Sequence, residues 1–155
     1  MMIMQANLLD TQFQLVAHQV NCRGVMGAGI ARALNEATHG ELLKQYREYI
    51  EEQGGEVLGT CFPYYCKGGR YILNLFGQDG FGTSKQQTNY EALRSALIDA
   101  WRDVSCELQK PDAQMCIAIP YKMGCGLAGG DWNKVTEILE EIEREYNVLF
   151  IAHKI

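Results

Sequence analysis

The chain has 155 residues, of which 47% are hydrophobic and 21% charged, and its formal net charge is -5. This length suits one domain with its own core, spanning 1–155, and the negative charge argues against a broad nucleic-acid surface, which needs clustered Lys and Arg. Six scattered cysteines without a C-x-x-C pair predict reduced thiols. Since the first residues do not resemble a secretory signal and no apolar run reaches membrane-spanning length, we expect a cytoplasmic protein.

The first half of the chain alternates predicted strands and helices. An apolar run predicts a strand over 13–20, and helical spacing of apolar residues predicts one helix after Gly29 and another from Glu41 to about Gln53. Two further strands are predicted at 56–64 and 70–76. Because proline has no N–H to donate, Pro63 predicts that the 56–64 strand lies at a sheet edge or carries a bulge.

The second half repeats this alternation after an irregular stretch. Residues 77–85 contain three glycines and Phe81, which predicts a mobile loop at the end of a strand. Thr88 and Glu91 form a capping-box pattern for a helix that reaches about Val104, and strands are predicted at 115–120 and 148–153. Asp131 is expected to cap a final helix. The whole pattern predicts an α/β fold, a three-layer α/β/α sandwich around a largely parallel or mixed sheet.

Two stretches place glycines between an apolar strand and a helix, at 20–30 and at 116–130. Glycine lets the backbone approach an anion closely, and the N–H groups of the following turn point at it. Two such loops predict a ligand with two phosphates, whereas the alternative for each is a tight turn with close helix packing. The residues expected to contact the ligand are Asn21, Gly24, Val25, Met26, Gly27, Ala28, Gly29, Ile30, Phe81, Gly124, Cys125, Gly126, Leu127, Ala128 and Gly129.

Several familiar sites are excluded by spacing. The glycines at 24, 27 and 29 reverse the dinucleotide fingerprint, and neither loop ends in the Gly-Lys-Ser/Thr of a P-loop. No cysteine is followed six positions later by arginine, so a cysteine phosphatase loop is absent. The histidines at 18, 39 and 153 have no metal-ligand spacing. We therefore expect neither a metal nor a cofactor.

Two residues are candidates for proton transfer. His18 lies just before the first glycine loop, where it is either a core histidine or a general acid or base, and Asp79 is a loop carboxylate that can orient water or a hydroxyl. Asn21 is either a turn cap or a donor to a sugar hydroxyl. Cys22 and Cys125 have no histidine next to them in sequence, so loop packing is favoured over nucleophilic catalysis.

In combination these segments resemble the macrodomain, an ADP-ribose-binding α/β/α module. The resemblance covers nearly the whole chain and is carried by Ala6-Asn7-Leu8-Leu9 and by the segments 20–31, 70–74 and 119–132. It implies that Asn7 and Leu8 lie beside adenine, that Asn21 lies near the distal ribose, and that the glycine loops flank the diphosphate. It also implies a mixed sheet of six or seven strands.

Within that family the chain is most similar to the branch of ADP-ribosyl glycohydrolases and ADP-ribose 1″-phosphate phosphatases. The lysine of the glycohydrolases is missing near Gln78 unless Lys85 replaces it, and Ala128 stands where some carry aspartate. His18 matches a histidine proposed as catalytic in the phosphatases. The resemblance therefore implies hydrolysis of ADP-ribose 1″-phosphate. The alternatives are a non-catalytic reader and a glycohydrolase acting on ADP-ribosylated protein or DNA.

Overall fold

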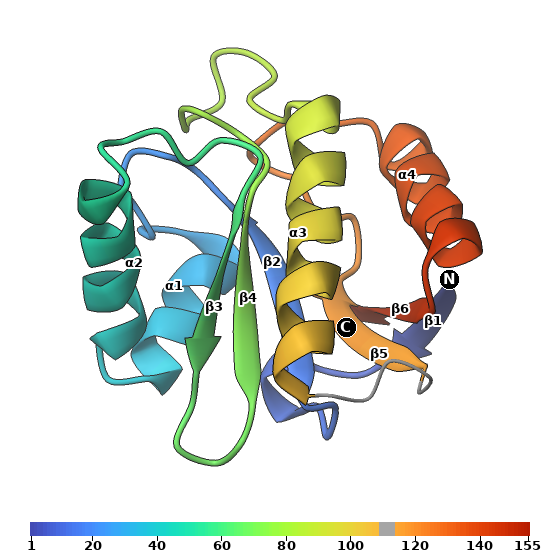
Figure 1. Cartoon of the computed structure of the whole chain (residues 1–155). Coiled ribbons are helices and arrows are strands. Elements are labelled where there is room, and N and C mark those ends of the chain that lie inside the picture. The colour runs from blue at the N-terminus through green and yellow to red at the C-terminus, as the bar shows by residue number, and fades with distance from the viewer. Residues whose placement is uncertain (109–113) are drawn as a thin grey trace.

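The computed structural model describes residues 1–108 and 114–155, and within them it contains one six-stranded sheet of order β1-β6-β5-β2-β4-β3 (Figure 1). Every neighbouring pair is parallel except β3 with β4, so the sheet is mixed. Pro63 lies in β3 at the sheet edge, as predicted. The strands are β1 (Met2–Gln5), β2 (Leu15–Val20), β3 (Cys61–Tyr65), β4 (Tyr71–Phe76), β5 (Met115–Pro120) and β6 (Val148–Lys154).

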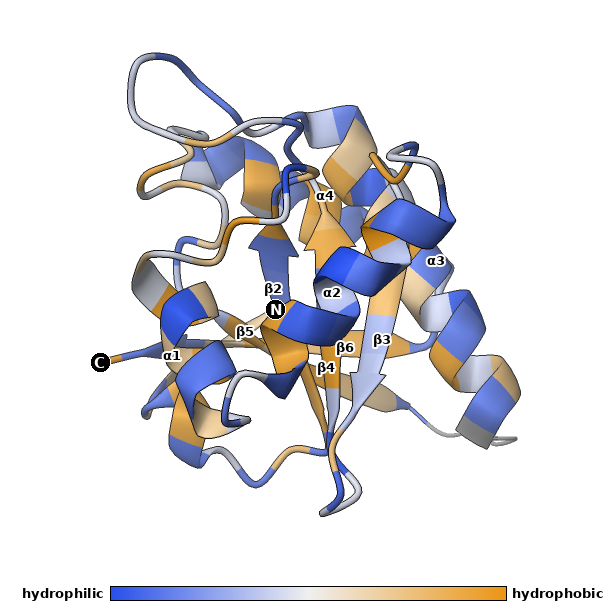
Figure 2. Ribbon diagram, turned by 90° about the vertical axis from the view of Figure 1, so that its left-hand side faces the viewer, coloured by the Kyte–Doolittle hydropathy of each residue, from blue (hydrophilic) through white to orange (hydrophobic). Residues whose placement is uncertain are grey.

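Four helices cover both faces of this sheet, α1 and α2 on one side and α3 and α4 on the other (Figure 1). Their polar sides face outward and their apolar sides face the strands (Figure 2). The predicted three-layer α/β/α sandwich is therefore confirmed. The helices are α1 (Gly29–Ala37), α2 (Glu41–Glu52), α3 (Tyr90–Leu108) and α4 (Trp132–Glu145), with a short 3-10 helix η1 (Leu8–Asp10) after β1.

Each face of the sheet has its own apolar core. Leu73, Leu97 and Leu139 belong to the cluster beneath α3 and α4, whereas Tyr46 and Phe76 belong to the cluster beneath α1 and α2. Alternation along β4 explains the division, since successive side chains point to opposite faces. Burial of each large apolar side chain stabilises the fold by about 1.5–3 kcal/mol.

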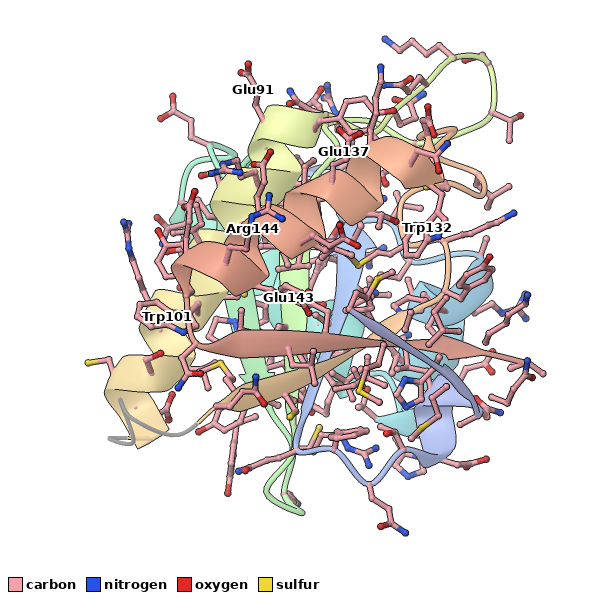
Figure 3. All side chains as sticks on the ribbon, turned by 90° about the vertical axis from the view of Figure 1, so that its right-hand side faces the viewer. Glu91, Trp101, Trp132, Glu137, Glu143 and Arg144 are labelled. Carbon is pink, nitrogen blue, oxygen red and sulfur yellow. The ribbon has the colours of Figure 1, made fainter. Side chains whose placement is uncertain are left out.

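Carboxylates fix both ends of the last helix. Asp131 caps α4 as predicted, because its Oδ1 accepts the backbone N–H of Asn133 at 2.9 Å. Near the other end of α4, Glu143 lies between the helix and β6 (Figure 3), where its Oε2 accepts the N–H of Phe150 at 2.9 Å. The helix is thus held to the sheet by polar contacts as well as by its buried face.

Two expectations require correction. The capping box at Thr88 and Glu91 is wrong, because Asn89 Oδ1 accepts the N–H of Ala92 at 3.0 Å and thus caps α3. Thr88 has a different partner, since its hydroxyl donates to the carbonyl of Gly124 at 2.6 Å. The strand predicted at 56–64 is shorter and begins at Cys61, because backbone turns occupy the residues before it. No helix of the described residues has the length and apolar character of a membrane span.

Candidate functional site

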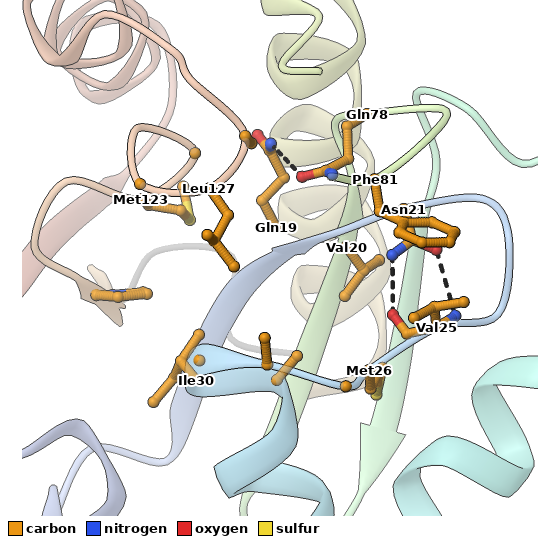
Figure 4. Close-up of a pocket in the computed structure, with 18 of the residues that line it drawn as sticks. Gln19, Val20, Asn21, Val25, Met26, Ile30, Gln78, Phe81, Met123 and Leu127 are labelled. Atoms are coloured by element: carbon orange, nitrogen blue, oxygen red, sulfur yellow. Dashed lines mark hydrogen bonds between the residues drawn. The ribbon is translucent and has the colours of Figure 1, made fainter. Parts of the chain in front are cut away.

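A cleft of about 620 Å³ opens at the carboxyl ends of β2, β4 and β5 (Figure 4). This is the edge at which open α/β sheets bind ligands. Along the sheet it extends from Phe81, in the loop after β4, to Lys122, in the loop after β5. The lining residues are Gln19, Val20, Asn21, Val25, Met26, Gly27, Ala28, Gly29, Ile30, Ala31, Gln78, Phe81, Gly82, Pro120, Lys122, Met123, Gly124, Gly126, Leu127 and Ala128.

The first glycine loop presents the start of α1 to this cleft. Ala28 occupies the N-cap position, and it has no side chain that can accept the free N–H groups of the first turn. The backbone N–H groups of Gly27 and Ala28 donate no hydrogen bond within the described residues. Because the helix dipole adds partial positive charge at the same end, these N–H groups are suited to an anion.

Asn21 holds the shape of this loop. Its Oδ1 accepts the N–H groups of Arg23 at 2.9 Å and Val25 at 3.3 Å, and its Nδ2 donates to the carbonyl of Val25 at 2.8 Å. The hydroxyl of Tyr46, from α2, donates to both the side-chain and the backbone oxygen of Asn21. Asn21 is therefore a turn cap, and Figure 4 shows its two bonds to Val25. Because Nδ2 donates one bond, the second of its two amide hydrogens remains for a ligand.

The second glycine loop faces the first across the cleft. It is closed by hydrogen bonds from Cys125 N–H to Lys122 O and from Gly130 N–H to Gly124 O, both 2.9 Å long. A Cβ at Gly130 would lie 2.5 Å from the carbonyl oxygen of Gly124, so this position admits only glycine. Within the described residues, the N–H groups of Lys122, Gly124, Gly126, Leu127 and Ala128 in this loop donate no hydrogen bond. This loop thus offers a second set of donors to an anion.

An amide network joins the second loop to the loop after β4. Gln19 Nε2 donates to Gln78 Oε1 at 2.8 Å and to Thr88 Oγ1 at 2.9 Å (Figure 4 shows the first bond). Thr88 in turn donates to Gly124, and Gln78 Nε2 donates to the carbonyl of Gly80 at 2.8 Å. The amide nitrogen of Gln19 is therefore the donor for both Gln78 and Thr88. Through these two acceptors it links the loop after β4 to the second glycine loop.

Substitution of Gln19 by Glu is expected to make stability depend on pH. An ionised carboxylate cannot donate to Gln78 or Thr88, so the variant should lose about 1–3 kcal/mol at pH 8. Partial burial beside two acceptors raises the pKa of the new carboxyl in the folded state. The loss of stability is therefore complete above the raised pKa, and it becomes smaller as the pH falls through that pKa and the carboxyl gains a proton. Urea unfolding at pH 8 and pH 5.5, relative to the unsubstituted protein at each pH, measures this.

A matched control is Gln14→Glu, since Gln14 Nε2 is likewise a hydrogen-bond donor, here to the backbone carbonyl of Gly69 at 3.0 Å, but at the exposed surface. It should change stability by less than about 0.5 kcal/mol at either pH. A Gln19→Glu protein as stable as wild type at pH 8 would contradict the role of this network.

The two candidates for proton transfer lie outside the lining of the cleft. His18 has no exposed surface, and its Nε2 is 2.7 Å from Asn74 Oδ1 on β4, while its Nδ1 has no partner. Burial lowers the pKa of His18 to about 4, despite the opposing effect of Asn74. Asp79 is exposed and pairs with Arg23 at 2.7 Å. These surroundings favour the core-histidine alternative for His18, and the catalytic role of both residues stays a prediction.

The thiols of the two glycine loops are poor nucleophiles. Burial is the main cause that raises the pKa of Cys22 and of Cys125 to about 11, so both stay protonated near neutral pH. Their Sγ atoms contact the carbonyls of Gln78 and Met123, each at 3.4 Å. Both contacts agree with the packing role expected from the sequence.

Most of the expected ligand contacts line the cleft, and some do not. Leu8 is buried in the core, whereas Asn7 caps η1 by accepting the N–H of Leu9 at 3.0 Å. Their place beside a base stays a prediction, as does any role of Lys85, which is exposed. The other expected contacts outside the lining are Gly24, Cys125 and Gly129. Sequence reasoning missed Gln19, Val20, Ala31, Gln78, Gly82, Pro120, Lys122 and Met123 as lining residues.

Comparison with known proteins gives one consistent family. A family model described as "Macro domain" matches residues 17–139. The ADP-ribose 1″-phosphate phosphatase of Scheffersomyces stipitis is 27% identical over 155 residues, 87% of each chain. The DNA ADP-ribosyl glycohydrolase of Thermus aquaticus is 25% identical over 142 residues, which cover 88% of this chain and 36% of that protein.

Solved structures agree. The macrodomain of Mycobacterium tuberculosis DarG superimposes with a TM-score of 0.73 at 25% identity, covering 99% of both chains. Thermosipho africanus DarTG in complex with ADP-ribose superimposes with a TM-score of 0.74 at 15% identity, covering 97% of this chain and 40% of that one. At 15% identity, the similarity to DarTG shows a shared fold.

Proposed function

Because this chain belongs to the macrodomain family, we propose that it binds ADP-ribose and hydrolyses a derivative of it at the distal ribose, with ADP-ribose 1″-phosphate as the first choice of substrate. The single observation that carries the proposal is the pair of glycine loops whose free N–H groups face one cleft. Backbone donors from two sides suit a diphosphate, which carries charge on both phosphorus atoms. The names of the relatives agree with this ligand.

The position of the diphosphate between the loops orients the rest of the ligand. We place the distal ribose toward Asn21, Gln78 and Phe81, where one free amide hydrogen and an exposed ring are available. Adenosine then extends in the other direction, over Ile30 and toward Lys122. The apolar side chains of this half of the cleft suit the faces of a base and a ribose.

In the proposed reaction, water forms a new bond to phosphorus and the 1″ oxygen leaves with a proton, which yields ADP-ribose and inorganic phosphate. The glycine loops and Asn21 would hold the ribose in place, while His18 and Asp79 are the residues proposed for proton transfer. Neither lines the cleft, so a change of side-chain position or a bridging water is needed for either to reach the 1″ oxygen.

One observation favours a second candidate function, a reader that binds ADP-ribose without turnover. Among the described residues that line the cleft, Lys122 is the sole titratable side chain, so no carboxylate or imidazole faces the ligand. A glycohydrolase that uses Lys85 is the third candidate. Lys85 is exposed and does not line the cleft.

Calorimetry followed by phosphorus NMR separates these functions. We expect ADP-ribose to bind with a micromolar dissociation constant, about 8 kcal/mol, and AMP to bind much more weakly. Phosphorus NMR should then report release of inorganic phosphate from ADP-ribose 1″-phosphate. Binding without release would support the reader, and an assay of Lys85→Ala on ADP-ribosylated protein and DNA would test the glycohydrolase. Equal affinities for AMP and ADP-ribose would contradict a diphosphate site.

A further inference from the structure

Two lysines and two aromatic rings gather at the end of the cleft opposite Phe81, where β5 and β6 end side by side. The ring of Tyr121 is the centre of this group, since Lys154 Nζ lies 4.7 Å and Lys122 Nζ 5.8 Å from its centroid. Trp132, at the start of α4 (Figure 3), packs edge-on against Tyr121 with centroids 5.4 Å apart. A hydrogen bond from Tyr121 N–H to His153 O, 3.0 Å long, fixes the two strand ends together.

The two ammonium groups have no carboxylate partner. Within the described residues, neither Lys122 nor Lys154 forms an ion pair, although the chain carries 19 acidic side chains. The cation–π contacts with Tyr121 are at exposed side chains and leave both positive charges without a counter-charge. An anion would supply that counter-charge, and Lys122 already lines the cleft.

The backbone of Lys122 supports a function at this position. Its φ is +59°, and His39 is the other non-glycine residue with positive φ among the described residues. A long side chain in this conformation costs about 1 kcal/mol or more, which glycine would avoid. Strain of this kind is typical of ligand sites, where a side chain must point in a fixed direction.

We propose that Lys122, Lys154 and Tyr121 form a subsite for a further phosphate group, one carried by the adenosine ribose of the bound nucleotide. The inference rests on the proposed function, which directs adenosine toward Lys122. Lysine ammonium groups bind phosphate as point charges, and the rings of Tyr121 and Trp132 exclude part of the surrounding water, which strengthens the attraction. The preferred ligand is therefore ADP-ribose that carries a phosphate on the adenosine ribose, and ADP-ribose 2′-phosphate is the probe for it.

Calorimetry with ADP-ribose and with ADP-ribose 2′-phosphate tests the subsite. We expect the second ligand to bind about tenfold more tightly at low salt, and this preference to fall as ionic strength rises. Lys154→Ala should abolish most of the preference and leave the affinity for ADP-ribose within about twofold. Lys122→Ala should abolish most of the preference as well. The matched control is Lys134→Ala, because Lys134 Nζ lies 5.3 Å from a different ring, that of Tyr90, and does not line the cleft.

The outcomes distinguish the subsite from the function on which it rests. If both ligands bind with equal affinity, the subsite is wrong and the ADP-ribose site stands. If neither ligand binds, both are wrong. A preference that survives in the double variant Lys122→Ala/Lys154→Ala, or one that Lys134→Ala abolishes equally, overturns the assignment to these residues.

Discussion

Gly126→Val is expected to weaken ADP-ribose binding by a hundredfold or more, about 2.7 kcal/mol, while the protein stays folded. A Cβ at Gly126 would meet no atom within 4 Å, Gly126 lines the cleft, and its φ is not among the positive values. The valine methyl groups would occupy the space of a phosphate and cover the free N–H groups of the second loop. Gly27→Val should act similarly, since its Cβ would come no closer than 4.0 Å to the nearest atom, Val25 Cγ1.

Substitutions at two other glycines serve as comparisons for this result. Gly68, in the turn between β3 and β4 at the opposite end of the sheet, also has open space around a Cβ, so Gly68→Val should keep both affinity and stability. Gly130→Val should instead unfold the second loop, because of the carbonyl oxygen of Gly124. Calorimetry and thermal unfolding on all four variants give the comparison. Full affinity in Gly126→Val would refute a diphosphate between the loops.

Acidification is expected to destabilise the protein through His18. The folded state holds the pKa of this imidazole at about 4, whereas the unfolded chain restores a value near 6.5. The unfolded state therefore binds the proton more tightly. The contribution of neutral His18 to the free energy of unfolding is fully present above about pH 6.5. It declines by up to about 3 kcal/mol as the pH falls to 4. Urea unfolding at several pH values measures the slope.

The variant His18→Gln removes this titration, so its stability should be lower at pH 7 and change less between pH 7 and pH 4. His39→Asn is the control, because His39 is exposed and asparagine tolerates its positive φ. It should keep the acid sensitivity of the wild type. An identical slope in wild type and His18→Gln would mean that His18 is not the group responsible.

The same variant decides the catalytic prediction. If His18 transfers a proton, folded His18→Gln should bind ADP-ribose normally and release phosphate from ADP-ribose 1″-phosphate at least about a hundredfold more slowly. Turnover equal to that of the wild type would assign the residue to the core alone, in agreement with its contact to Asn74.

The order of the layers could be predicted because apolar periodicity and turn residues agree along most of the chain. β2, β4, β5 and β6 are apolar runs bounded by polar or glycine-rich segments, and each was found within two residues of its ends. The apolar periodicity does not predict β1, and only the six or seven strands implied by the family resemblance allow for it. Its four residues are all exposed at the sheet edge, so burial imposes no alternation on them.

Tertiary partners explain most of what the sequence could not predict. The sequence predicts Thr88 as a helix cap, but its hydroxyl donates a hydrogen bond to the carbonyl of Gly124, 36 positions later. Gln19 looks like an ordinary strand residue, and nothing in its neighbours indicates that two loops meet its amide. The glycine loops were found because their function lies in the backbone, where local sequence controls both conformation and access.

The lack of a side-chain cap at the start of α1 has a consequence for engineering. Replacement of Ala28 by Asp or Ser would supply the missing helix cap and is the kind of change that stability-guided redesign selects, with a gain of about 1 kcal/mol. The new oxygen would accept the N–H groups that we assign to the ligand, and with Asp its negative charge would also oppose the phosphates. Thermostability and affinity therefore compete at this residue, and a library selected only for heat resistance should lose its binders here first.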